Sequence, residues 1–117
     1  MRVFGLLVLA ILLLSGMVAA DTTGEIQHLL GFVAASPCKF ERNGSVHDGP
    51  EARDHIKRKY EYYRDKVKTA EDFIKYSATR SKLSGKKYKI DCPGFDQMNT
   101  SDWLLNELSE YRKNSKG

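Results

Sequence analysis

The 117-residue sequence lacks the short motifs that would identify a common catalytic site. It has no G-x-S-x-G turn, so the serine nucleophile of the α/β-hydrolases is not expected. It has no Gly-rich loop of the Walker or dinucleotide-binding type, which excludes those two modes of phosphate binding. Its three histidines and two cysteines show none of the spacings familiar from zinc sites. We therefore predict no catalytic residue, no metal ligand and no cofactor.

Long apolar runs are confined to the N-terminus. Arg2 precedes a nearly unbroken apolar run over residues 3–14, and this region ends in Val18-Ala19-Ala20. Small residues at the last and third-last positions suit signal peptidase, so residues 1–20 are predicted to be a signal peptide cleaved after Ala20. The alternative is a short membrane anchor, but no basic stop-transfer flank follows the run. No cysteine follows it either, which excludes a bacterial lipoprotein anchor.

The predicted mature chain, residues 21–117, is poor in aliphatic residues and contains no further apolar run long enough for a membrane span. Arg2 is the only charge in the first 20 residues, so 18 basic residues remain against 15 acidic ones, a net charge of +3. The 97 residues left of 117 suffice for one small domain with a modest core. A covalent staple would help a core of this kind.

Only two cysteines are present, and an even number in an exported chain favours a disulfide. Cys38–Cys92 is the one possible intramolecular pair, and free thiols or an intermolecular bridge are the alternatives. Each cysteine lies in a short run that alternates in polarity, residues 38–42 and 88–92. The sequence therefore predicts two short strands joined by the bridge.

An antiparallel register with the two cysteines opposed gives consistent partners along both strands. It pairs Phe40 with Ile90, Lys39 with Asp91, Glu41 with Lys89 and Arg42 with Tyr88. Apolar and opposite-charge pairs of this kind each contribute a few tenths of a kcal/mol up to about 1 kcal/mol. The same register brings the turn signal Asn43-Gly44 beside residues 84–88.

Four helices are predicted around this sheet. Thr22 and Glu25 have capping-box spacing before a first helix that stops near Pro37, and Asp48 with Pro50 begins a second that runs to about Lys68. Thr69 caps a third, Thr100 or Ser101 caps a fourth, and the polar residues 113–117 are expected to fray. The expected fold is α+β, with about four helices packed on a two-stranded antiparallel sheet and one disulfide.

An ordered series of short motifs covers nearly the whole predicted mature chain. It comprises Glu25-Ile26-x-His28-Leu29-Leu30, Arg42-Asn43-Gly44-x-x-His47, Ala52-x-x-His55, Glu71-Asp72-Phe73-Ile74, Ser84-Gly85-x-x-Tyr88 and Trp103-Leu104. This series resembles the YfeK-like proteins, small exported bacterial proteins with a domain of unknown function. The resemblance implies a Gram-negative periplasmic location. It implies no activity, so no catalytic residue is carried over.

Basic residues cluster between the third helix and the second strand, and they form the predicted binding surface. A concentrated positive patch attracts phosphates and other anions. The predicted binding residues are Arg42, Asn43, His47, His55, Arg80, Lys82, Ser84, Lys86 and Lys87. Outside the cytoplasm nucleic acid is not an expected target, so we expect a non-catalytic binding module for an anionic envelope component or a periplasmic protein partner. A loop kept soluble by its lysines is the alternative interpretation.

Two other functions remain open from the sequence. In the first, His47 and His55 with Glu51 form the acid–base or metal centre of a small hydrolase. In the second, Ser84-Gly85-x-x-Tyr88 is similar to a short motif of periplasmic lysozyme inhibitors, whose loop serine enters the lysozyme cleft. Those inhibitors are β-rich, whereas this chain is predicted to be mostly helical.

Overall fold

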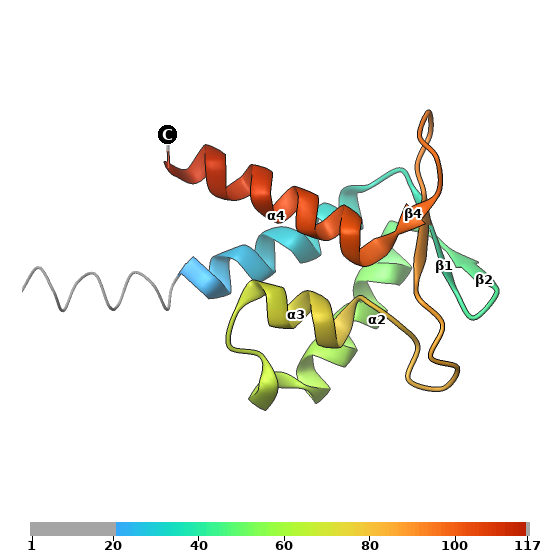
Figure 1. The fold of residues 1–117 in the computed structure, drawn as a ribbon, viewed down its shortest axis with the longest axis horizontal. Coiled ribbons are helices and arrows are strands. Elements are labelled where there is room, and N and C mark those ends of the chain that lie inside the picture. Colours follow the sequence, from blue (N-terminus) through green and yellow to red (C-terminus); the bar gives the residue numbers. More distant parts are fainter. Residues whose placement is uncertain (1–20, 117) are drawn as a thin grey trace, which may run out of the picture.

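The computed structural model describes residues 21–116, and over this range the chain forms four α-helices and one four-stranded antiparallel sheet (Figure 1). The helices are residues 21–35, α2 (Gly49–Tyr62), α3 (Ala70–Ser77) and α4 (Thr100–Lys116). The strands are β1 (Lys39–Arg42), β2 (Ser45–His47), β3 (Lys89–Asp91) and β4 (Met98–Asn99), in the order β2-β1-β3-β4. The predicted α+β class is confirmed, but the prediction of a two-stranded sheet is wrong.

The central pair of strands has the predicted register. β1 and β3 are antiparallel, with Phe40 opposite Ile90, and the disulfide joins Cys38 to Cys92 at the end of the pair. Phe40 and Ile90 are both buried in the core. The predicted charge pairs are opposed, but the two acids bond elsewhere, since the Gln97 amide donates to both Glu41 and Asp91. The bridge and the apolar pair therefore hold this register within the described residues, without direct ion pairs across it.

The two outer strands were missed because each depends on its partner. Asn43 and Gly44 have φ values of 53° and 79°, and a two-residue turn with positive φ at both positions is the type I′ turn of a tight β-hairpin. The turn signal was recognised, but β2 has only three residues and β4 only two. Segments this short show no measurable periodicity in a sequence.

The predicted capping residues begin α2 and α3 but not α4, whose first helical residue is Thr100 itself. The prediction that Thr100 or Ser101 caps α4 is wrong, since the buried Thr100 hydroxyl has no hydrogen-bond partner within residues 21–116. Asp48 caps α2 in a capping box with Glu51, and the Thr69 hydroxyl accepts from the backbone N–H of Asp72 at the start of α3. The predicted continuation to Lys68 is wrong, since α2 ends at Tyr62 and a single 3₁₀ turn, η1 (Arg64–Lys66), follows.

The two terminal helices also differ from expectation. Residue 21 is already helical, so Thr22 is not where the first helix begins. α4 extends to Lys116, so the expected fraying from Lys113 is not seen, and the Ser115 hydroxyl donates to the carbonyl of Tyr111 in this last turn. The predicted signal peptide, residues 1–20, lies outside the described residues.

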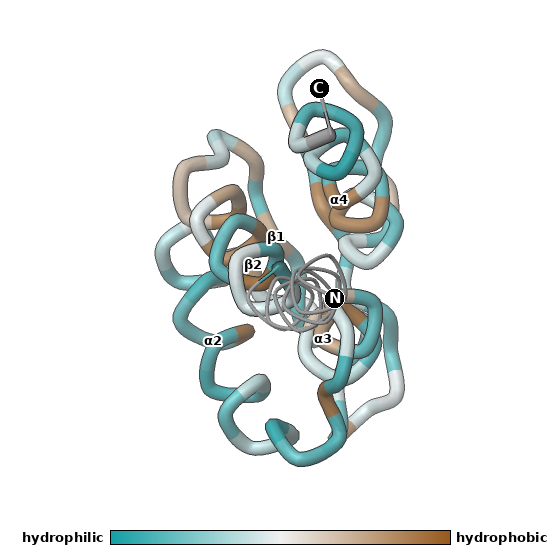
Figure 2. Tube along the Cα trace, turned by 90° about the vertical axis from the view of Figure 1, so that its left-hand side faces the viewer, coloured by the Kyte–Doolittle hydropathy of each residue, from teal (hydrophilic) through white to brown (hydrophobic). Residues whose placement is uncertain are grey.

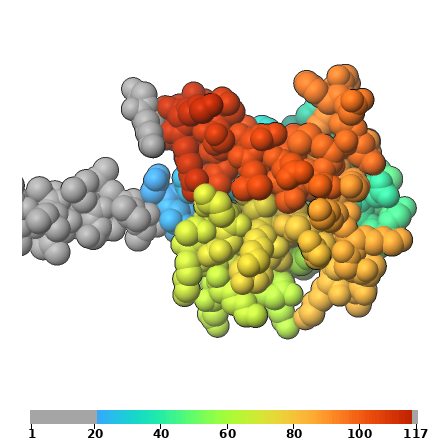
Figure 3. Space-filling model, viewed as in Figure 1, coloured from blue at the N-terminus to red at the C-terminus, as the bar shows by residue number. Residues whose placement is uncertain are grey.

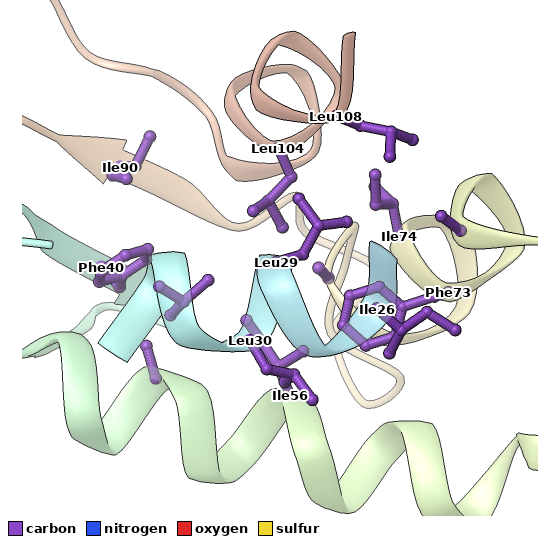
Figure 4. Close-up of a cluster of buried hydrophobic side chains, with 14 of the residues drawn as sticks. Ile26, Leu29, Leu30, Phe40, Ile56, Phe73, Ile74, Ile90, Leu104 and Leu108 are labelled. Carbon is purple, nitrogen blue, oxygen red and sulfur yellow. The ribbon is translucent and has the colours of Figure 1, made fainter. Parts of the chain in front are cut away.

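The helix over residues 21–35 lies at the centre of the core. Figure 4 shows its side chains between α2 below and α3, α4 and β3 around it. Leu29 has no exposed surface, and at most 2% of the surface is exposed in its core neighbours Phe73, Ile74, Leu104 and Leu108. In Figure 2 the apolar turns of α4 face the other helices. Among the described residues, no helix is both long and apolar enough to cross a bilayer.

Candidate functional site

A cleft of about 310 Å³ opens between α2, the β1–β2 turn and the loop over residues 81–87, and we call it the basic cleft. Its lining includes the cations Arg42, Arg58, Lys59 and Lys82 and the tyrosines Tyr62, Tyr63 and Tyr88. No carboxylate of the described residues lines it. Figure 3 shows the loop at the surface beside the C-terminal part of α2. The basic cleft is therefore a concave, strongly cationic surface with aromatic walls.

The secondary structure explains why these residues meet. His55, Lys59 and Tyr62 follow one another at intervals of four and three residues, so they share one face of α2. Arg42 is the last residue of β1, and the β1–β3 register carries it beside Tyr88. The face of α2 and the end of the central strand pair thus form opposite sides of the cleft.

A chain of hydrogen bonds crosses the base of the cleft. Arg42 Nη1 lies 3.1 Å from His55 Nδ1, and His55 Nε2 lies 3.2 Å from the Tyr88 hydroxyl. Because a guanidinium can only donate, Nδ1 is the acceptor and the ring proton of neutral His55 sits on Nε2, which donates to Tyr88. Lys59 Nζ donates to the same hydroxyl at 3.0 Å. The Tyr88 oxygen accepts twice, so its own proton is left to donate into the cleft.

The protonation of this chain follows from burial and from the crowding of cations. Burial, and after it the nearby charges of Arg42 and Lys59, lower the pKa of His55 to about 4, so the ring is neutral at pH 7. Burial and then Arg42 and Lys82 lower the pKa of Lys59. Burial raises the pKa of Tyr88, which keeps the phenol protonated. The cleft therefore presents hydrogen-bond donors and positive charge.

The depressed pKa of His55 predicts a loss of stability in mild acid. The folded value is about 4 and the ordinary value is 6.5, so between these pH values the unfolded chain binds more protons. The free energy of unfolding should therefore fall as the pH drops from 6.5 toward 4. His55→Gln keeps an acceptor for Arg42 and a donor for Tyr88 but does not titrate, so its free energy of unfolding should fall less in urea titrations across this range.

His47→Gln is the matched control for this experiment, because it removes a histidine that lies outside the hydrogen-bonded chain. It should leave the steep part of the pH dependence in place. Equal pH dependence in wild type and His55→Gln would contradict the assignment.

The side chain of Asn43 joins the β1–β2 turn to the loop over residues 81–87 through two hydrogen bonds. Its Nδ2 donates to the buried hydroxyl of Ser81 at 3.0 Å, and its Oδ1 accepts from the Ser84 hydroxyl at 2.6 Å. Within the loop, the Ser81 hydroxyl also accepts from the backbone N–H groups of Leu83 and Ser84, and Gly85 takes a φ of 73°. The predicted proximity of turn and loop is confirmed, and the Ser84 hydroxyl is engaged in holding it.

The structure brings together four of the nine predicted binding residues in the lining of the basic cleft, namely Arg42, Asn43, His55 and Lys82. Ser84 bonds to one of them, Asn43. Lys86 and Lys87 instead line a neighbouring hollow of about 440 Å³ with Glu41 and Lys89, and Asn43 contributes to both linings. The side chain of Arg80 does not line the basic cleft, although its carbonyl accepts from Lys59 at 2.8 Å.

His47 lies apart from the basic cleft. Its Nδ1 is 3.6 Å from Glu51, and it borders a cavity of about 30 Å³ on the other side of His55. His28, interpreted from the sequence as structural, bonds to Glu107 at 2.6 Å and stacks on Tyr111. Within residues 21–116 no three His, Cys, Asp or Glu side chains form a group that could hold a metal ion.

The sequence analysis missed three lining residues on α2: Arg58, Lys59 and Tyr62. A signal for them was present, because Lys59 and Tyr62 lie one and two turns beyond His55 on the same face. Lys86 and Lys87 lie close to Lys82 in sequence, whereas Arg58 and Lys59 approach it only in the folded chain.

Comparison with known proteins gives a family without an assigned activity. Residues 20–112 match the sequence model described as "Family of unknown function (DUF5329)", and the chain belongs to this family. No curated protein and no solved structure gives a significant match. The comparisons leave the resemblance to the YfeK-like proteins as a prediction.

Proposed function

We propose that this member of a family of unknown function is a small, exported, non-catalytic module that binds an anionic group of an envelope component in the basic cleft. One observation carries the proposal. Arg42, Arg58, Lys59 and Lys82 line one cleft, and none of them forms an ion pair with a carboxylate within residues 21–116. Cations held close together without a counter-charge repel one another, and an anion entering between them relieves that repulsion.

The donors in the cleft suit a phosphate or a similar oxyanion. Arginine can bond to two oxygens at once, and lysine supplies a compact charge beside it. The Tyr88 hydroxyl has a proton to donate, because its oxygen already accepts from His55 and Lys59. Lys82 lies over the ring of Tyr62, 4.7 Å from its centroid, which holds this exposed cation at the rim.

The same geometry favours binding over catalysis. Both ring nitrogens of His55 are engaged, and burial keeps its pKa near 4 and that of Tyr88 above its ordinary value. A general base poised near neutral pH would need the opposite tuning. The chain of bonds instead fixes the direction in which Arg42 and Tyr88 present their donors.

Three observations support a periplasmic location for the protein and its ligand. They are the predicted signal peptide, the resemblance to exported YfeK-like proteins, and the disulfide, which is typical of oxidising compartments. Phosphate groups of lipids and lipopolysaccharide and the carboxylates of acidic glycans are the abundant anions of a bacterial envelope. We therefore propose a periplasmic envelope component as the source of the anion.

The test is direct binding of defined anions to the purified protein. Inorganic pyrophosphate and vesicles containing 30% phosphatidylglycerol are the probes, with isothermal titration and vesicle co-sedimentation as the readouts. We expect binding that weakens as salt rises, and a loss of about tenfold or more in the Arg58→Glu/Lys82→Glu variant, because two cations at the rim become acids. Both positions are exposed, so the variant should fold.

Lys57→Glu/Lys68→Glu is the matched control, because it makes the same change in net charge at exposed positions outside the basic cleft. Equal losses in the two variants would show a general charge effect and would contradict a site in the cleft. Binding to vesicles without binding to pyrophosphate would assign the anion to a lipid.

A further inference from the structure

A second concave surface lies at the other end of the central strands. It is a pocket of about 580 Å³ beside the disulfide, and we call it the apolar pocket. Arg42, the last residue of β1, lines the basic cleft. Cys38, which directly precedes the first residue of β1, lines the apolar pocket. Figure 1 shows the loops of the two sites leaving opposite ends of β3. Sequence reasoning did not find this pocket, because its lining comes from three distant stretches of the chain, residues 32–38, 90–98 and 103–106.

The frame of the apolar pocket is built from constrained groups. The disulfide between Cys38 and Cys92 lines it, together with the adjacent Pro37 and Pro93. Trp103, on the first turn of α4, packs against Phe32 with ring centroids 4.7 Å apart. A volume of this size falls within the range of about 300–1,000 Å³ that is usual for small-molecule sites.

The lining is aromatic and apolar, with one charge. Phe32, Trp103 and Phe95 present rings, and Phe95 is 78% exposed in the loop at the rim. Asp96, the next residue, is the only charged side chain of the lining, and it forms no ion pair or hydrogen bond with the described residues. Aromatic faces carry negative potential and attract cations, most of all when the cation is desolvated.

The geometry points to a small apolar organic cation, a protonated amine or quaternary ammonium with apolar substituents, as the ligand of the apolar pocket. The substituents would fill the space against Trp103 and Phe32. The positive centre would lie between the ring of Phe95 and the carboxylate of Asp96. An anionic amphiphile would be repelled by Asp96, and the lining contains no cation to attract it. A neutral ligand would gain nothing from the Asp96 charge. This site does not depend on the anion site proposed for the basic cleft.

Trp103 is the only tryptophan of the chain, so its fluorescence reports directly on the pocket. The probe is phenyltrimethylammonium, compared with its uncharged isostere tert-butylbenzene and with the anion phenylacetate. We expect the cation to change Trp103 emission and to bind about tenfold tighter than the isostere, with phenylacetate weakest. Asp96→Asn should bring the affinities for cation and isostere together, and Phe95→Leu should weaken the cation several-fold while sparing the isostere.

Glu61→Gln is the matched control, because it removes one exposed acid on α2, away from the pocket, and it should leave cation binding unchanged. Equal binding of cation and isostere to the wild type, or an unaltered preference in Asp96→Asn, would overturn the proposal. A dimer that the cation dissociates would also overturn it, since the pocket would then serve a second copy of the chain. Pyrophosphate binding to the basic cleft should persist in Asp96→Asn, which separates this test from that of the proposed function.

Discussion

Replacing both Cys38 and Cys92 with alanine is expected to lower the free energy of unfolding by about 4 kcal/mol, because the bridge closes a long loop in the unfolded chain. The two residues are 54 positions apart. A loss of this size is a large part of the roughly 5–15 kcal/mol that stabilises a typical domain. Urea unfolding followed by circular dichroism measures it, and we expect a lower midpoint in the double variant.

Reduction of the wild-type protein provides the control for side-chain packing. It breaks the bridge and leaves both sulfur atoms in place, so it should reproduce most of the loss. If the reduced protein were as stable as the oxidised one, the disulfide would not contribute to the stability of the fold. A large loss in the alanine variant alone would then assign the effect to the buried side chain of Cys38.

The second large effect is expected at Arg112, which joins three helices. Its guanidinium makes two hydrogen bonds to Glu25 of the helix over residues 21–35 and two to Glu71 of α3, with distances from 2.7 to 3.0 Å. These bonds lower the pKa of the Glu71 carboxyl and raise that of Arg112. Only 7% of the Glu25 side chain is exposed, so Arg112→Leu would leave a buried carboxylate without its partner.

We expect Arg112→Leu to cost about 3 kcal/mol in the free energy of unfolding, at the lower end of the range for breaking a buried pair, because the arginine is itself partly exposed. The double variant Glu25→Leu/Arg112→Leu should recover much of this loss, since apolar side chains of similar size replace buried ion pairs at little cost. Thermal and urea unfolding of the single and double variants measure the difference.

Lys113→Leu is the neighbouring control, because the Lys113 side chain is 71% exposed and, among the described residues, pairs only with Glu110, at 3.6 Å. Its effect should stay within about 0.5 kcal/mol, as for most exposed pairs. A double variant as unstable as Arg112→Leu would show that apolar packing of the arginine, rather than the unpaired Glu25, causes the loss.

The central part of the fold was predictable because several local signals agreed on one register. The cysteines, the apolar pair of Phe40 and Ile90, and the two charge pairs all specified the same pairing of β1 and β3. The Asn43-Gly44 signal separately marked the turn at which β1 ends. Capping signals at Asp48 and Thr69 placed the starts of α2 and α3 for the same reason, since each depends on residues within one turn.

The features that could not be predicted depend on contacts between distant segments. β4 exists because it pairs with β3, and two residues carry no pattern of their own. Arg112 meets Glu25 and Glu71 across 87 and 41 positions, so neither spacing nor composition pointed to it. Only part of the lining of the basic cleft was predicted. Arg42 and His55 were named, but Arg58 and Lys59 reach the cleft only because α2 packs beside the end of β1.

The bonds of Asn43 have a consequence for the kinetics of recognition. Since Ser81 and Ser84 both bond to this one side chain, the hairpin turn and the loop over residues 81–87 hold their relative positions without a ligand. A preorganised surface of this kind spends little conformational entropy on association, and oppositely charged partners are drawn to it over a distance set by salt. Association with the anion proposed for the basic cleft should therefore be fast, with no ordering of this loop to slow it.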